Sequence, residues 1–375
     1  MKTHMLKAFY GLIAVCFLLT SIGFAKTYYV GGCKGAGYPT ISAAVKVAPP
    51  GSRVAVCPGT YPEQVFITQE LTLVGISSGT AGRARITVPS VVGGPPNWTF
   101  VPDPDGGPIM VAPQIYVNSP AGAVTIENLT IDASGETTAP PCGGSGGWDT
   151  TAILLENSSS TIKGVNTVGQ GKNSGCGIGI WDFVAGTAPA KLSLTNSSLQ
   201  DANEVGLHLD GAGLSASVKG NVLDVTSFAF AILSYNASGT VSSNIINASS
   251  SNLVYDSGTG GSITYSDNVL RGTTGCFEGV LLERAAQVTG NKIDGCIAGI
   301  EINAYSTYAV TIKTNLIVNN VSTAVALECA SDVTLSGNTV NNAAVGVDSA
   351  LSPVLASQIT FDNVDTLATS TLTCP

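Results

Sequence analysis

The residues best able to do chemistry lie on short alternating segments in the middle of the chain. His208 and Asp210 are two residues apart in the segment GLHLD, so on a β-strand both side chains point to the same side. Two carboxylates about 6.5–9.5 Å apart suit an inverting glycoside hydrolase, and Asp182 on the preceding segment is a candidate partner for Asp210. A histidine side chain beside such carboxylates can transfer protons. The catalytic candidates are Asp182, His208, Asp210, Glu283 and Arg284.

A second pattern joins these candidates to aromatic residues. When the alternating segments are aligned, their last outward position is occupied mainly by acids and aromatics: Glu156, Trp181, Asp210, Tyr235, Glu283, Asn303, Glu328 and Asp348. Carboxylates accept hydrogen bonds from sugar hydroxyls, and aromatic rings cover the apolar faces of pyranoses. We call this the acid–aromatic stripe and predict that Glu156, Trp181 and Tyr235 bind substrate there, beneath the loops at residues 93–108 and 136–148. A solvated sheet face kept soluble by acids is the alternative.

The elements that position these residues come from an internal repeat. Segments with an apolar residue on each side of an asparagine recur every 23 to 25 residues. Their asparagines are Asn196, Asn221, Asn244, Asn268, Asn291, Asn315, Asn338 and Asn363. Each repeat contains short segments that alternate with period two, and none contains a helix-length apolar stripe. The spacing is too short for a propeller blade, and the leucine-rich consensus is missing.

This repeat predicts an all-β fold, a right-handed single-stranded parallel β-helix with coils of about 24 residues over residues 53–372. Each coil adds one rung of about 4.8 Å along the axis. The asparagines are expected to stack at one corner, where they also suit an αL turn. Residues Thr40–Ala48 are expected to form a short helical cap with Thr40 as N-cap, followed by strands at Arg53–Val56, Glu63–Thr68 and Leu71–Gly75.

The N-terminal segment also carries a family resemblance. The sequence YPTISAAV begins at Tyr38, and VCPGTYPEQV and LTLVG follow it up to Gly75. This order resembles the opening of pectin-lyase-like parallel β-helices, and of pectin methylesterases especially. The resemblance spans about 40 residues and implies a β-helix that acts on polysaccharides.

The catalytic motifs of that class are incomplete. The segment GIWDFVAG shares Gly179, Asp182, Phe183 and Gly186 with the methylesterase segment whose aspartate attacks the ester. The upstream glutamine motif and the later arginine segment are missing, so Asp182 would lack an acid–base partner and an oxyanion donor. The motifs of polygalacturonases and pectate lyases are missing as well. The sequence therefore favours an exported glycan-binding β-helix, and the alternative is a secreted lyase, glycoside hydrolase or esterase.

Residues 1–25 are predicted to be a signal peptide. Lys2 and Lys7 precede an apolar run from Ala8 to Ile22, and the small residues needed for cleavage end at Ala25. The run is too short to span a membrane, and no later stretch looks transmembrane. A net charge of −9 argues against nucleic-acid binding. We expect a secreted, periplasmic or cell-surface protein with one domain over residues 26–375. Within it, residues 26–52 form the cap, 76–150 the loop-rich early coils and 151–375 the regular coils.

The cysteines that remain after cleavage are even in number, which in an exported chain argues for disulfides. The pairings favoured by proximity are Cys33–Cys57, Cys142–Cys176, Cys276–Cys296 and Cys329–Cys374. A zinc site is disfavoured because His208 is the only histidine beyond residue 25 and no C-x-x-C pair exists. No metal and no cofactor is expected.

Overall fold

The structure is a computed structural model that describes most of the chain beyond residue 25. The described residues are 26–77, 82–89, 99–102, 108–136, 148–172, 176–226, 230–249, 252–273, 275–303, 308–328, 330, 332–349 and 359–370. The expected signal peptide, most of the two loops expected to cover the stripe, and Cys142, Cys329 and Cys374 lie outside these residues.

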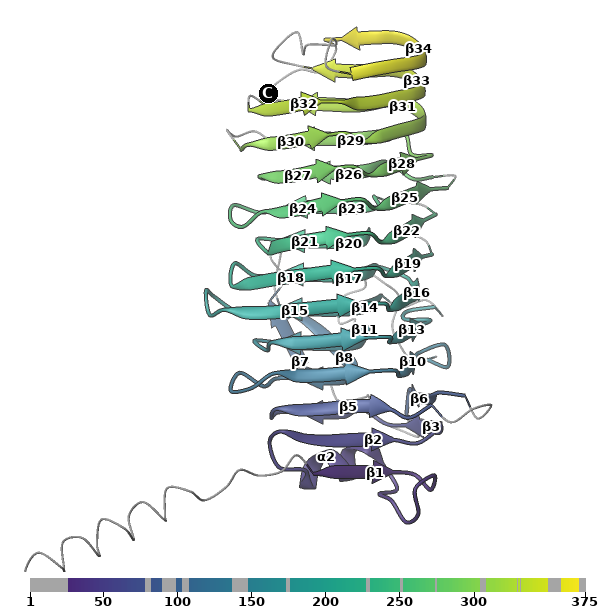
Figure 1. Cartoon of the computed structure of the whole chain (residues 1–375), viewed down its shortest axis with the longest axis vertical. Helices are drawn as coiled ribbons and strands as arrows, with labels where there is room; N and C mark the ends of the chain where they lie inside the picture. Colours follow the sequence, from purple (N-terminus) through teal and green to yellow (C-terminus); the bar gives the residue numbers. More distant parts are fainter. Residues whose placement is uncertain are drawn as a thin grey trace, which may run out of the picture.

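The chain winds as a solenoid whose successive coils contribute strands to three faces (Figure 1). The first face is a twelve-stranded parallel sheet. Its strands are β1 (Thr27–Val30), β2 (Ser52–Val56), β5 (Leu71–Gly75), β9 (Val124–Glu127), β12 (Ser160–Lys163), β15 (Ala190–Thr195), β18 (Leu214–Lys219), β21 (Ser238–Ser242), β24 (Ile263–Ser266), β27 (Ala286–Thr289), β30 (Val310–Lys313) and β32 (Val333–Ser336).

The second face follows the first in each coil and is also parallel. Its strands are β3 (Gly59–Pro62), β6 (Ala84–Thr87), β10 (Thr130–Asp132), β13 (Asn166–Val168), β16 (Ser198–Ala202), β19 (Val222–Val225), β22 (Ile245–Ala248), β25 (Val269–Gly272) and β28 (Lys292–Asp294).

The third face completes each coil and carries the candidate site. Its strands are β4 (Val65–Ile67), β8 (Pro108–Val117), β11 (Trp148–Glu156), β14 (Gly177–Phe183), β17 (Val205–Asp210), β20 (Phe230–Tyr235), β23 (Val254–Ser257), β26 (Glu278–Leu282) and β29 (Ala298–Asn303). In the last coils the second and third faces merge into β31 (Leu316–Glu328), β33 (Asn338–Ser349) and β34 (Ile359–Thr369). Among the described strands, the exception to parallel pairing is β7 (Thr99–Pro102), which lies antiparallel to β8. The predicted all-β parallel solenoid is confirmed.

The N-terminal helix forms where it was expected. Helix α2 (Ile41–Val47) begins after Thr40, whose side chain accepts a hydrogen bond from the Ala43 amide, and Ala48 is its C-cap. It lies at the N-terminal end of the solenoid beside β1 (Figure 1), and Ile41 and Val45 join the core. No helix among the described residues is long and apolar enough to cross a membrane.

Aliphatic side chains from all three faces fill the interior in one continuous hydrophobic cluster. On the first face, for example, Leu73, Ile126, Ile162 and Leu194 stack in register through successive coils, and each is fully buried. Stacking aliphatic residues rung upon rung removes their surface from water along the whole axis, which is why the chain needs little charge to specify its fold.

The asparagine ladder lies at the corner between the first and second faces. Six side chains are stacked there and each is at most 1% exposed: Asn221, Asn244, Asn268, Asn291, Asn315 and Asn338. The Nδ2 of each of the first five donates to the Oδ1 of the next at 2.9–3.0 Å. The same Oδ1 accepts the backbone amide of the preceding asparagine. The expected inward stack is confirmed.

Two details of the ladder differ from the expectation. The αL conformation belongs to the residue before each ladder asparagine, such as Gly290 before Asn291 with φ 69°. Asn196 and Asn363 themselves have positive φ and are exposed, so they are not ladder members. Ser197 takes the ladder position in its coil, where its amide donates to Asn221 Oδ1 at 2.9 Å. In these coils Asn is used for its tolerance of αL.

Two of the four expected disulfides are present among the described residues, Cys33–Cys57 and Cys276–Cys296. Cys176 is also disulfide-bonded. Its expected partner Cys142 and both cysteines of the expected Cys329–Cys374 pair lie outside the described residues, so these pairings stay predictions.

Candidate functional site

Parallel pairing in the third face fixes which outward side chains are stacked in register. The first outward column consists of Tyr116, Leu154, Trp181, His208, Leu233, Tyr255, Leu281, Glu301, Ala326 and Asp348. The second column, two residues further along each strand, contains Glu156, Phe183, Asp210, Tyr235 and Ser257, and later Asn303 and Glu328. Glu283 directly follows Leu282 of β26, beside this column.

The predicted acid–aromatic stripe corresponds to the second column with two corrections. Trp181 and Asp348 lie in the first column, and Phe183 occupies the place predicted for Trp181. Tyr255 was not predicted. In its coil Asp256 points inward, at a position that is aliphatic in most of the other coils, so the alternating pattern is hidden.

The prediction that Trp181 and His208 face solvent is wrong. Their rings stack with centroids 4.7 Å apart and an interplanar angle of 14°. Trp181 is 0% and His208 5% exposed. Trp181 belongs to a second hydrophobic cluster outside the coil, and this cluster includes Val101 of β7 and Val111 of β8. The β7–β8 hairpin thus covers this part of the face, in line with the expectation that the early loops fold over it.

Burial also removes His208 as an acid–base catalyst. Loss of solvent lowers the pKa of His208 to about 3, so the ring is neutral at physiological pH. Within the described structure, its Nε2 has no hydrogen-bond partner. Asp210 is likewise buried, with 5% of its surface exposed. The proposed His208–Asp210 pair is therefore closed to a substrate from solvent.

Asp182 points into the coil interior. It is paired in register with Leu155 and Leu209, which are both core residues, and it is 0% exposed. Neither carboxylate oxygen has a hydrogen-bond partner within the described part of the chain. Burial raises the pKa of Asp182 well above its usual value. Asp182 matches the methylesterase nucleophile in sequence, but an ester in solvent cannot reach its buried carboxyl group.

Replacing Asp182 with leucine is expected to stabilise the protein at neutral pH. The folded-state pKa is raised, so the unfolded chain ionises first and stability falls as pH rises above about 4. The variant has no such group, so its free energy of unfolding should exceed that of the natural chain by about 1–3 kcal/mol at pH 7. Denaturant unfolding at pH 4 and pH 7 measures this. The gain should shrink at pH 4, and a variant less stable at pH 7 would contradict the assignment.

Arg284 is an interior residue and not a surface base. Its Nε donates to Asp256 Oδ1 at 2.5 Å, its Nη2 to Ser234 Oγ at 2.9 Å, and its Nη1 to the Gly260 carbonyl. Arg284 is 1% and Asp256 0% exposed. Burial raises the pKa of Asp256 to about 6 although Arg284 lies beside it. Both side chains of the pair are buried inside the coil. A substrate in solvent cannot reach Arg284, so it is not a catalytic candidate.

An aromatic and acidic arrangement remains accessible beyond the covered section. Tyr255 donates a hydrogen bond from its hydroxyl to Glu283 Oε2 at 2.8 Å. The ring of Phe230, on the preceding coil, lies 5.4 Å from that of Tyr255. All three residues are half-buried, as is Tyr235 at the end of the same strand as Phe230. A carboxylate is thus held beside aromatic rings at the surface, which is the chemistry predicted for the stripe.

A similar arrangement lies on the other side of the covered section. The Tyr116 hydroxyl donates a hydrogen bond to Glu156, and Asn118 Nδ2 donates to the same hydroxyl at 3.1 Å. Phe66 lies edge-on to Tyr116 with ring centroids 5.8 Å apart. Phe66 is 40% exposed, and Tyr116 and Glu156 are half-buried. Glu156 was predicted from sequence, and its two aromatic neighbours were not.

Three glutamates continue the accessible surface toward the C-terminus. Burial and the Glu301 carboxylate raise the pKa of Glu278 to about 7. Burial and Glu328 raise the pKa of Glu301. Strands β20, β23, β26, β29, β31 and β33 contain no lysine or arginine, so no cation from these strands offsets the carboxylates. At neutral pH, Glu278 therefore retains a proton for part of the time.

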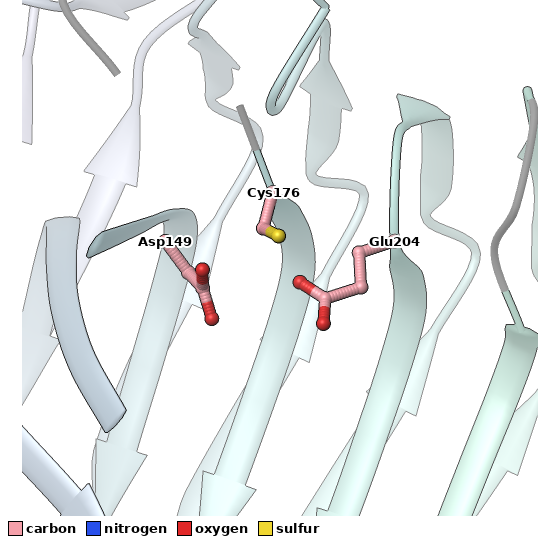
Figure 2. A group of neighbouring side chains, drawn as sticks. All are labelled: Asp149, Cys176 and Glu204. Carbon is pink, nitrogen blue, oxygen red and sulfur yellow. The ribbon is translucent and has the colours of Figure 1, made fainter. Parts of the chain in front are cut away.

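Asp149, Cys176 and Glu204 form the one metal-like cluster among the described residues. Figure 2 shows the three side chains gathered from neighbouring coils, and their ligand atoms lie within 4.8 Å of one another. The sulfur of Cys176 is in a disulfide, and the ligand form of cysteine is the thiolate. Two carboxylates remain, fewer than the three protein ligands of a typical catalytic zinc site. We assign no metal to this cluster.

Comparison with known proteins agrees with the fold. A protein-family model described as "Periplasmic copper-binding protein (NosD)" matches residues 190–353, which is less than half of the chain. No curated protein matches the chain.

Solved structures are similar to nearly the whole solenoid. The A-module of the Azotobacter vinelandii mannuronan C-5 epimerase AlgE4 is 16% identical, with a TM-score of 0.54 and coverage of 89% of this chain and 93% of that one. The GH136 lacto-N-biosidase from Eubacterium ramulus is 11% identical, with a TM-score of 0.54 and coverage of 92% and 66%. The periplasmic alginate epimerase AlgG is 13% identical, with a TM-score of 0.50 and coverage of 89% and 82%. At such identities the likeness concerns the fold.

The described residues of the matched segment do not fit a copper site. Copper is bound mainly by cysteine, methionine and histidine side chains. Residues 190–353 contain no methionine, a single histidine, the buried His208, and three cysteines, of which Cys276 and Cys296 are joined in a disulfide and Cys329 lies outside the described residues. The match therefore supports the repeated coil, and the described residues offer no copper site. By its fold, the chain is a parallel β-helix protein, similar in architecture to the alginate epimerases and the lacto-N-biosidase.

Proposed function

We propose that this chain is an exported right-handed parallel β-helix, one domain over residues 26–375, that binds glycans on the outer surface of its third face. The signal-like segment at residues 1–25, the disulfides and the match to a periplasmic family support export. Right-handedness follows from the strong preference of parallel crossover connections.

The observation that carries the proposal is the hydrogen bond of 2.8 Å between Tyr255 and Glu283. It holds the carboxylate beside the Tyr255 ring while the second oxygen is left to accept a sugar hydroxyl. The neighbouring Phe230 ring restricts the Tyr255 ring. Because the two side chains are already oriented, little conformational entropy is lost when a sugar binds.

The charge of the surface favours an uncharged glycan. Glu278, Glu301 and Glu328 lie on neighbouring strands that contain no lysine or arginine, and Glu283 directly follows the first of these strands. A polyuronate would bring further carboxylates to this surface, and like charges at close range repel. A neutral chain offers hydroxyls to the carboxylates and its apolar faces to the rings.

Replacing Tyr255 with alanine is expected to weaken binding of a neutral glycan several-fold. Loss of one aromatic contact corresponds to about 1 kcal/mol. The measurement is calorimetric titration of the mature chain with neutral oligosaccharides of the cello, xylo and N-acetylchito series, with oligogalacturonate as the charged comparison.

Tyr29→Ala is the matched control, because Tyr29 is a half-buried aromatic on the first face, in β1. It should leave the affinity unchanged. Equal loss in both variants, preference for oligogalacturonate, or no binding of any glycan would contradict the proposal. Thermal unfolding of each variant separates lost binding from lost fold.

A glycoside hydrolase is the second candidate, because one carboxyl group is suited to general acid catalysis. The pKa of Glu278 is raised to about 7, and the carboxylate of Glu301 on the next coil, which contributes to that rise, supplies a second carboxylate. Release of reducing ends from the bound glycan, lost in Glu278→Gln while binding persists, would identify this activity. Unchanged release in that variant would exclude Glu278 as the acid.

A further inference from the structure

The tyrosine–glutamate pair of the proposed site occurs twice on the third face, in the same geometric relation. Tyr255 is paired in register with Leu281, two residues before Glu283. Tyr116 is paired in register with Leu154, two residues before Glu156. In both cases the hydroxyl donates to the carboxylate on the next coil. One local arrangement is therefore built from two unrelated sequence segments.

Each pair also has the same kind of surroundings. A phenylalanine on the preceding coil contacts each tyrosine, Phe230 at 5.4 Å and Phe66 at 5.8 Å between ring centroids. Five of the six residues lie on β4, β8, β11, β20 and β23, and Glu283 directly follows β26; these six strands contain no lysine or arginine. Both surfaces therefore offer rings and a carboxylate without a neighbouring cation on these strands.

A covered section separates the two pairs. Trp181 and His208 lie between them in the same outward column. Trp181 belongs to the cluster that includes Val101 and Val111 of the β7–β8 hairpin, and His208 stacks on Trp181. Tyr116 and Phe230 pack against this cluster. β23 lies five rungs beyond β8 in the third face, with four coils between them, a distance of about 24 Å at 4.8 Å per rung. A short oligosaccharide therefore cannot occupy both surfaces in direct contact with the sheet.

We propose that the third face holds two equivalent glycan subsites, Phe66–Tyr116–Glu156 and Phe230–Tyr255–Glu283, and that the protein binds neutral polysaccharide bivalently. This inference rests on the proposed function, because it extends the chemistry of the Tyr255 site to Tyr116. Bivalence follows from the separation of the subsites. One polymer engaged at both points, or two chains joined by one protein, would gain avidity without any additional contact.

The test compares a trisaccharide with the polymer of the same neutral series. Equilibrium dialysis with saturating trisaccharide should give two bound per natural chain and one for either Tyr116→Ala or Tyr255→Ala. The natural chain should bind the polymer at least 100-fold more tightly than the trisaccharide. Either single variant should lose most of that gain. Tyr116→Phe and Glu156→Gln, which keep the side-chain shape, provide a second pair of variants in case Tyr116→Ala does not fold.

The outcomes separate the two proposals. One trisaccharide per natural chain, with unchanged stoichiometry in every Tyr116 and Glu156 variant, overturns the second subsite and leaves the Tyr255 site intact. Absence of binding for all neutral series overturns the proposed function itself. Two bound trisaccharides that disappear one at a time with the Tyr255 and Tyr116 variants support both proposals.

Discussion

Replacing Arg284 with methionine is expected to lower the free energy of unfolding by about 3–5 kcal/mol. The guanidinium is 1% exposed and bonds to Asp256, Ser234 and the Gly260 carbonyl, so its loss leaves a buried carboxylate without its counter-ion. Methionine retains much of the volume, which limits the contribution of a cavity. Urea-induced unfolding of the purified mature chain gives the value.

The double variant Asp256→Leu/Arg284→Met is the matched control. It removes both charges, and buried ion pairs replaced by apolar residues of similar volume often lose little stability. We expect it to recover most of the loss caused by Arg284→Met. If Arg284→Met is as stable as the natural chain, or if the double variant is less stable than Arg284→Met, the Arg284–Asp256 pair does not stabilise the interior.

Replacing Asn291 with alanine is expected to cost about 2–3 kcal/mol of stability. The Asn291 amide donates to the Tyr265 carbonyl and to Asn315 Oδ1, and its Oδ1 accepts from the Asn268 backbone and side chain. All three asparagines are 1% exposed, so no water can replace the lost partners without entering the coil. Each buried polar group left without a partner costs about 1–3 kcal/mol.

Asn341→Ala is the control for this effect. Asn341 also bonds through its amide, to Asp362 at 3.0 Å, but this contact is exposed to solvent. Water replaces an exposed partner, so we expect a change below about 0.5 kcal/mol. A similar loss in both variants would mean that burial contributes nothing to the ladder.

The fold could be predicted because the same sequence pattern recurs in successive coils. Spacings of 23 to 25 residues between asparagines locate the corner of each coil, and inward aliphatic residues such as Ile126 and Leu194 alternate around it. Positions with αL geometry were harder to assign. Glycine, serine, aspartate and threonine all precede ladder asparagines with positive φ, so no single residue type indicates that conformation.

The register of the third face was harder to predict because two coils break the alternation. Asp182 and Asp256 occupy inward positions that a pattern of apolar and polar residues assigns to the outside. A shift of β14 by two residues against its neighbours leaves the alternating pattern unchanged. Trp181 was therefore predicted in the second outward column, whereas it lies in the first. An aspartate at an inward position looks like a surface residue in a single sequence, so its burial cannot be predicted.

The covering of Trp181 and His208 could not be predicted in detail for a different reason. The covering depends on the antiparallel pairing of β7 with β8. The composition of this part of the sequence indicates only loops, so the pairing could not be predicted. The contact of Val101 with a cluster on β14 and β17 is long-range and carries no periodic signal. The accessible residues, Tyr235, Glu156 and Glu283, were predicted, while the rings that orient the last two were not.

The central claim, that neutral glycans bind at Tyr255, is tested most directly by fluorine NMR of the mature chain labelled with 3-fluorotyrosine. Tyr→Phe substitutions assign the resonances of Tyr255, Tyr116 and Tyr265. Titration with the neutral oligosaccharide that binds most tightly should shift the Tyr255 resonance and, at the second subsite, the Tyr116 resonance. The resonance of Tyr265, which is 1% exposed in the interior, should stay in place. A glycan that binds while the Tyr255 resonance does not move would contradict the claim.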